Sequence, residues 1–230
     1  MNALYKTAVS LLAICAAVPQ GPAAVARVPA SVLRLVGGSP LTLAMALADA
    51  SVPAGLEIKQ TDWAAPHPHF DLTRDDAFIS EIELVAAFNE RHSAYRAVII
   101  DGVIVIRPIA SQPDYLDSEA KEFQVQGRGL VSIASRLFEP LKNGGSRLGQ
   151  TGSMLSAVGV DVDRGDNIAL TVDSRGQAVL TVLNGIVMQA PGHVWLVVVA
   201  ADSRTPLRFG FVHQSGTTTE RAIPESVPQP

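Results

Sequence analysis

Residues 95–108, YRAVIIDGVIVIRP, decide the fold of the first half of the chain. Two runs rich in β-branched and apolar residues flank the dipeptide Asp101-Gly102. A type I′ turn needs positive φ at both of its central residues, and Asp-Gly meets that need. The stretch therefore predicts a β-hairpin with strands over 95–100 and 103–106.

Upstream of this hairpin, the pattern predicts a strand, a helix, a strand and a second helix. We expect a strand over 32–36 and a helix capped by Ser39, with Pro40 at its first position. Alternation over 56–59 predicts a half-buried strand. In the second helix we expect Glu81 and Glu83 to face water and an apolar stripe to face the core: Phe78, Ile82, Val85 and Phe88.

A similar order of elements follows about 90 to 100 residues later. The expected elements are strands over 123–127 and 168–172, a helix over 130–138, and strands over 194–200 and 207–212. The spacing of Ser174 and Gln177 predicts a capping box before a helix with Val179, Leu183 and Ile186 on one face.

We therefore predict an α+β fold of two small modules of the type β-α-β-β-α-β-β, with the second module as a duplicate of the first. Two unrelated modules, or one larger mixed sheet, are the alternatives. The expected boundaries are a module at 27–110, a linker at 111–121, a second module at 122–214 and a disordered tail at 215–230.

The N-terminus has the features of a secretory signal peptide over residues 1–26. Lys6 precedes an apolar run over 7–18, and Ala24-Val25-Ala26 is a small-x-small cleavage site. The run is shorter than the roughly 20 residues of a membrane span. We expect export to the periplasm or secretion. An uncleaved anchor, or lipid attachment at Cys15, are the alternatives.

Cleavage after Ala26 would remove Cys15, the only cysteine, so the mature chain would have no disulfide and no thiol site. Lys plus Arg would fall from 18 to 17 against 22 acidic residues, so the net charge would move from −4 to −5. No basic cluster is present in the sequence, and we expect no nucleic-acid partner.

A set of core positions in the first module carries a family resemblance: residues 43–48, 55–58, 84–88 and 101–108, together with Tyr95. With these positions, residues 41–108, about a third of the chain, resemble the short N-terminal domain shared by secretins and TonB-dependent receptors, the STN domain. The resemblance implies a periplasmic domain that contacts other envelope proteins. No plug, barrel or secretin core follows, and no functional residue is carried over, because the match is one of core positions.

One segment has metal-ligand chemistry. His67, His69 and Asp71 would share one side of a strand, and imidazole with carboxylate suits zinc. Pro66 and Pro68 favour a loop with surface histidines instead. We assign no catalytic, cofactor-binding or metal-binding residue and expect no cofactor.

Two other features of the sequence bear on function. The residues from Ser118 to Lys121 match the Ser-x-x-Lys of penicillin-binding enzymes, but their companion motifs are missing. Trp195 opens an apolar strand and is expected in the core, whereas Trp63, in a polar loop, is the better candidate for recognition.

The sequence therefore predicts a non-enzymatic periplasmic adaptor or binding protein that contacts an envelope or cell-wall partner. It would bind through the Trp63 loop or an exposed hairpin edge. The alternative is an envelope hydrolase or metal-binding protein that uses the segment from His67 to Asp71.

Overall fold

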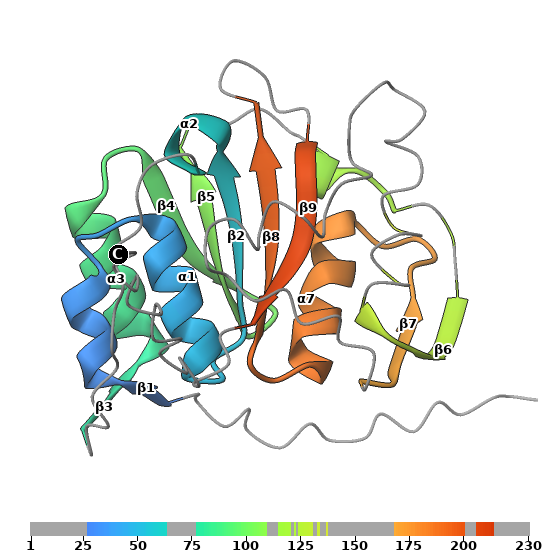
Figure 1. Ribbon diagram of the computed structural model, residues 1–230, viewed down its shortest axis with the longest axis horizontal. Helices are drawn as coiled ribbons and strands as arrows, with labels where there is room; N and C mark the ends of the chain where they lie inside the picture. The colour runs from blue at the N-terminus through green and yellow to red at the C-terminus, as the bar shows by residue number, and fades with distance from the viewer. Residues whose placement is uncertain are drawn as a thin grey trace, which may run out of the picture.

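The computed structural model describes residues 27–63, 77–109, 115–120, 122, 124–130, 133, 137, 168–200 and 206–213. Its centre is one five-stranded mixed sheet in the order β4-β5-β2-β8-β9 (Figure 1). β2 (Ala54–Lys59) runs parallel to β5 (Val103–Pro108) and to β8 (His193–Val199). β4 (Tyr95–Ile100) and β9 (Pro206–His213) pair antiparallel with β5 and β8.

This arrangement confirms the α+β class. It differs from the expectation of separate modules, because strands of both expected units lie in the same sheet. A duplication is not shown. β2 is buried along almost its whole length instead of half-buried, since helices cover both faces of the sheet at this central strand.

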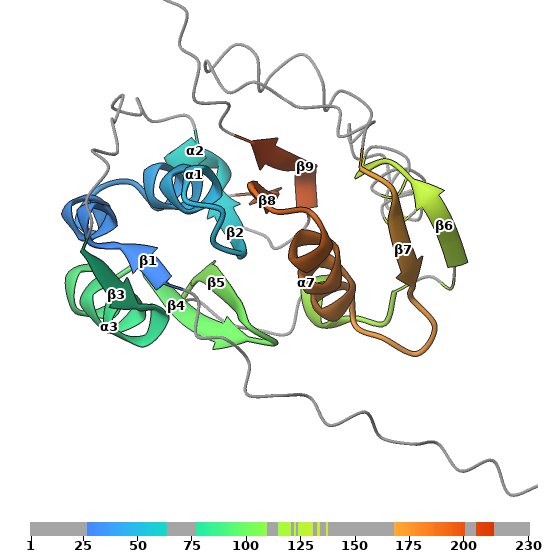
Figure 2. The ribbon, with the colours of Figure 1, turned by 90° about the horizontal axis from the view of Figure 1, so that it is seen from below.

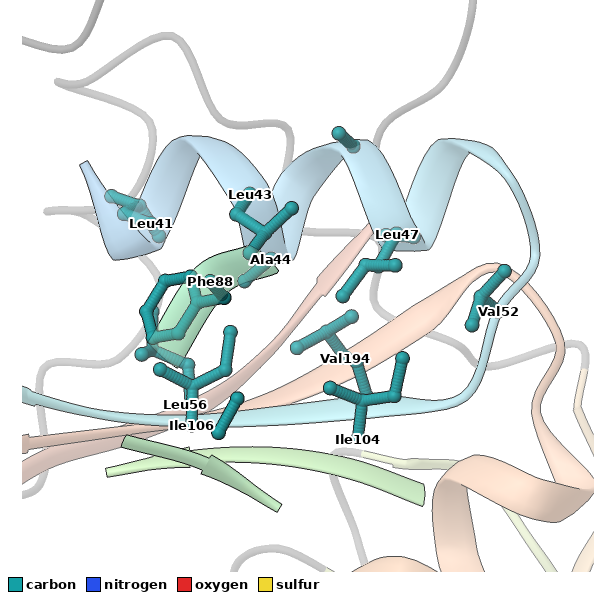
Figure 3. Close-up of a cluster of buried hydrophobic side chains, with 14 of the residues drawn as sticks. Leu41, Leu43, Ala44, Leu47, Val52, Leu56, Phe88, Ile104, Ile106 and Val194 are labelled. Carbon is teal, nitrogen blue, oxygen red and sulfur yellow. The ribbon is translucent and has the colours of Figure 1, made fainter. Parts of the chain in front are cut away.

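One face of the sheet is covered by α1 (Pro40–Asp49) and α3 (Glu81–Arg91). A small antiparallel sheet of β1 (Arg27–Pro29) and β3 (Phe78–Ser80) contacts α3 (Figure 2). Figure 3 shows Leu47 of α1 above Ile104 and Val194, which project from the sheet. This apolar layer is the first of two cores.

The other face is covered by α7 (Val179–Gln189) and by η2 (Tyr115–Asp117). Beyond α7 lies a second small antiparallel sheet, β6 (Gln124–Arg128) with β7 (Leu170–Asp173) (Figure 2). Leu130, Ile133 and Leu137 are helical and buried in this second core, as the apolar pattern predicts.

At the seam between the two units, where β2 pairs with β8, a glycine leaves room for a tryptophan ring. Gly55 of β2 lies opposite Trp195 of β8, and a Cβ added at Gly55 would stand 1.8 Å from a ring carbon of Trp195. The indole Nε1 donates to Oδ1 of Asn184 in α7 at 3.0 Å, and Asn184 Nδ2 donates to the carbonyl of Ile100 at 3.2 Å. The pairing of β2 with β8 thus depends on a glycine on one strand and a fully buried indole on the other.

The hairpin and the start of α1 are confirmed. Asp101 and Gly102 have φ of 54° and 76°, as a type I′ turn requires. Ser39 caps α1, accepting a hydrogen bond from the amide of Leu41 at 3.2 Å, and Pro40 opens the helix.

Two expectations for the first unit are wrong. Residues 32–36 are not a strand; η1 (Ala30–Leu35), a 3₁₀ helix, follows Pro29 and buries Val32. The stripe on the second helix is also shifted. Ser80 forms a capping box with Glu83, so the helix starts at Glu81 and buries Leu84 and Phe88, while Phe78 and Ile82 are exposed. Glu81, expected in water, is buried instead.

The capping box expected at Ser174 and Gln177 is wrong as well. Ser174 accepts from the amide of Gln177 through its main-chain oxygen, at 3.1 Å, in a turn that includes Gly176 with φ of +64°. α7 begins later, after Ala178, and has no side-chain cap. Its buried residues Val179, Leu183 and Ile186 match the predicted stripe.

Candidate functional site

A charged cluster lies at the carboxyl ends of β2 and β5. Glu57 of β2 is buried, and its Oε2 accepts from Arg107 Nε of β5 at 2.8 Å. The same guanidinium donates to both carboxylate oxygens of Asp117 in η2, at 3.1 and 3.3 Å. In open α/β sheets, ligands bind outside the carboxyl ends of the strands, so this cluster is where a site would be expected.

Beside this cluster, Tyr95 ties β4 to the end of β2. Its hydroxyl donates to Asp62 Oδ2 at 2.5 Å and accepts from the amide of Lys59 at 3.1 Å. Burial, helped by the hydrogen bond to Asp62, raises the pKa of Tyr95 well above its usual range. The phenol is therefore neutral at physiological pH and acts as a hydrogen-bond donor instead of a base.

These contacts give the cluster a structural role. Arg107 bridges a carboxylate of the sheet and one of the segment that enters the second unit, so it joins the two units. Among the described residues, no three of the residue types His, Cys, Asp and Glu gather closely enough to hold a metal ion.

The predicted metal residues His67, His69 and Asp71 lie outside the described residues, so that hypothesis stays a prediction. Ser118, of the Ser-x-x-Lys match, donates its hydroxyl proton to the carbonyl of Tyr115 at 2.6 Å. Lys121 lies outside the described residues.

The recognition role expected for Trp63 is not supported by its position. Trp63 ends α2 (Gln60–Trp63), a short helix directly after β2, and is only 7% exposed. It packs in the first core, so it does not offer an aromatic surface to a partner. Trp195 is in the core, as predicted.

Exposed apolar side chains concentrate in the first unit. Six large apolar residues of the described part are exposed, and five of them lie between residues 78 and 109: Phe78, Ile82, Val98, Ile99 and Ile109. Met188 of α7 is the sixth. Of the five in the first unit, Phe78 lies in β3 and Ile82 in the first turn of α3. Val98 and Ile99 lie in β4, and Ile109 comes directly after β5. β4 is the outermost strand at this end of the sheet (Figure 1).

The two small sheets also differ in whether their outward-facing side chains are apolar or polar. Val28 and Ile79 of β1–β3 face the first core, so the paired residues Pro29 and Phe78 face outward. In β6–β7 the inward residues are Val125 and Val172, and the outward residues are polar: Gln124, Gln126, Thr171 and Asp173. Only the sheet of the first unit therefore presents a large apolar side chain, Phe78, which is 54% exposed.

An amide side chain occupies one strand edge in each unit. Asn89 of α3 accepts from the amide of Ala97 at 2.8 Å and donates to its carbonyl at 2.9 Å. Gln189 of α7 does the same at Thr171 of β7, at 3.2 and 3.1 Å. Sequence reasoning missed both, because the partners lie 8 and 18 residues apart and no local motif marks them.

The comparisons with known proteins assign no family. No protein-family model matches the chain, and the searches of curated proteins and of solved structures found no significant match. Among the described residues, no helix combines the length and apolar character needed to cross a membrane.

Proposed function

We propose that this chain is an exported, non-enzymatic binding or adaptor protein of the periplasm that contacts other envelope proteins. The observation that carries the proposal is the concentration of exposed apolar side chains in the first unit, from Phe78 to Ile109. Exposed apolar surface costs solubility, and where it is concentrated it usually serves an interaction.

The N-terminal sequence supports export, because Lys6, the apolar run over residues 7–18 and the small-x-small site Ala24-Val25-Ala26 follow one another in the order of a secretory signal peptide.

The charged groups support a binding role over catalysis. A catalytic acid or base is a side chain that a substrate can reach and whose pKa lies near the working pH. In the cluster at the carboxyl ends of β2 and β5, Glu57, Arg107 and Asp117 are engaged with one another, and Tyr95 is held neutral. The resemblance of residues 41–108 to STN domains, which contact envelope proteins, points the same way.

Site-specific photo-crosslinking in living cells tests the binding role. A benzoyl-phenylalanine replaces Ile82 or Ile99 in the first unit, or Thr181 of α7 as the exposed control in the second. We expect discrete crosslinks to an envelope protein from positions 82 and 99, and none from position 181. Equal crosslinking from all three positions, or none from any, would contradict the proposal.

Intact-mass measurement of the protein from the periplasmic fraction tests the compartment. The expected mass is that of a chain starting at Arg27. A full-length chain recovered from the cytosol would refute export.

A further inference from the structure

We propose that the outer edge of β4 is a strand-addition site for an extended apolar segment of a partner protein, and that Asn89 occupies this edge until the segment arrives. The inference rests on the proposed function, because it names the surface and the kind of partner that this function requires.

The backbone of β4 has one paired edge and one outer edge. In an antiparallel ladder, successive residues direct their backbone groups alternately toward and away from the partner strand. Ile100 and Val103 flank the two-residue turn, and the carbonyl of Ala94 accepts from the amide of Ile109 at 2.9 Å. The even-numbered residues of β4 therefore direct their backbone groups toward β5. Tyr95, Ala97 and Ile99 therefore direct their amides and carbonyls outward.

Asn89 behaves like a residue of a missing neighbour strand. Its side-chain amide makes both hydrogen bonds that a paired backbone residue would make with Ala97, at 2.8 and 2.9 Å. A peptide strand offers the same donor and acceptor in the same plane and extends them to Ile99. The exchange replaces two hydrogen bonds with two of the same kind. Ala97 is only 1% exposed because α3 packs against β4 at this point, so the incoming segment must also move the end of α3 that carries Asn89 away from the edge.

The side chains around this edge fit an apolar strand. Val98 and Ile99 are each 38% exposed, and they point to opposite faces of the sheet because they are neighbours in a strand. An incoming strand with apolar side chains on both faces would cover both. Exposed apolar edges are where proteins accept added strands.

The edge of β7 offers a contrast within the same molecule. Gln189 pairs with Thr171 as Asn89 pairs with Ala97. Thr171 is exposed and polar, and its neighbours Leu170 and Val172 are buried, so this edge gives an added strand backbone partners without apolar contacts. Gln189 therefore protects an edge that is not used.

The occupant is a single extended segment, not a second folded copy. Only three residues of β4 face outward, and a pairing of that length covers far less than the roughly 800 Å² per partner of a stable interface. A flexible segment that adds one short strand fits a contact of this size.

The test uses a strand peptide with apolar side chains on both faces, acetyl-Lys-Val-Val-Val-Val-Val-Lys-amide, titrated into the mature protein and followed by amide NMR. We expect shifts at Tyr95, Ala97 and Ile99, with slower hydrogen exchange at the Ile99 amide. Asn89→Ala removes the competing amide and should tighten binding about tenfold. The matched variant Gln189→Ala should leave the affinity unchanged.

Two variants separate backbone pairing from side-chain contact. Ile99→Pro removes an outward amide and spares the β4–β5 ladder, so binding should fall at least about tenfold while the fold persists. Ile99→Ala keeps the amide and should weaken binding less.

Strand addition would be overturned by peptide shifts that lie outside both β4 and the end of α3 around Asn89, by equal effects of Asn89→Ala and Gln189→Ala, or by equal effects of the two Ile99 variants. Dimerisation of Asn89→Ala, measured by sedimentation, would overturn the choice of occupant. If any of these results appears while benzoyl-phenylalanine at position 82 still crosslinks to an envelope protein, the strand-addition proposal fails but the proposed binding function stands. Absence of crosslinks at every position removes the proposed function itself.

Discussion

The two units are built from the same structural parts and differ most in the side chains that these parts expose. Each has a small antiparallel sheet, a helix whose amide side chain holds a strand edge, and an antiparallel strand pair in the large sheet. In the second unit the outer face of the small sheet is polar and the capped edge has a polar exposed residue. In the first unit the corresponding surfaces expose Phe78, Val98 and Ile99. Because the shared plan carries different surfaces, the plan itself serves folding, and the apolar surface of the first unit is the feature on which we base the proposed binding role.

We expect the largest loss of stability from a substitution at the seam between the two units, where β2 pairs with β8. Gly55→Ala puts a Cβ into the ring of Trp195, so the central strand or the indole must move. We expect a loss of roughly 3 kcal/mol or more in the free energy of unfolding, as for severe overpacking. Chemical denaturation measures it. Gly185→Ala is the matched control, since a Cβ there meets no atom within 4 Å, and it should stabilise α7 by about 0.5–1 kcal/mol.

An ion pair in each unit gives the next largest contrast. Arg107→Met leaves the buried carboxylate of Glu57 without its guanidinium and should cost about 2–3 kcal/mol. Arg175→Met breaks the pair with Asp173, whose side chains are 60% and 38% exposed, and should cost much less than Arg107→Met, because water screens an exposed pair. Equal losses in urea denaturation would show that the Arg107 bridge does not join the units.

The helix caps differ in the same direction. Ser80→Ala removes the capping box of α3 and should cost about 1 kcal/mol. Ala178→Ser adds a cap that α7 lacks and should recover part of that amount. The hydrogen bonds from Ser80 lower the pKa of Glu83, so this stabilisation is present above the unfolded pKa and fades as pH falls through the folded one. An effect of Ser80→Ala that stays constant to pH 2 would contradict the cap.

Glu81 gives the smallest expected effect. Burial raises the pKa of Glu81, so its ionised form destabilises the folded state at neutral pH. Glu81→Gln should raise the thermal midpoint slightly at pH 7, and the difference should vanish below about pH 4, where both states are protonated. A variant less stable than the wild type at pH 7 would show that the charge is favourable at the start of α3.

Local signals in the sequence predicted local structure well. Asp101-Gly102 determined a turn and Ser39-Pro40 a helix start, because each depends on neighbouring residues alone. One larger mixed sheet was only an alternative, and the pairing of β2 with β8 was not predicted, since residues about 140 apart in the chain carry no mutual pattern. Trp63 was misplaced because a four-residue helix has too little periodicity to reveal which way its last side chain turns.

For the binding surface, the sequence located the hairpin edge but not the residues that matter on it. Phe78 and Ile82 have helical spacing and were assigned to the core. The cap at Ser80 changes the helix start and turns both outward. A single Glu three residues after a Ser was the signal that could have corrected the assignment.

One shared sheet unites the two units, so the surface that we propose for binding in the first unit lies on a scaffold that the second unit completes. Expression of residues 27–110 alone tests it directly, because this fragment lacks β8 and α7, which cover β2 and the second face of the sheet. The account predicts a fragment without a cooperative urea transition, although the full chain has one. A fragment that unfolds cooperatively, with dispersed amide resonances, would contradict the claim and support two separable modules.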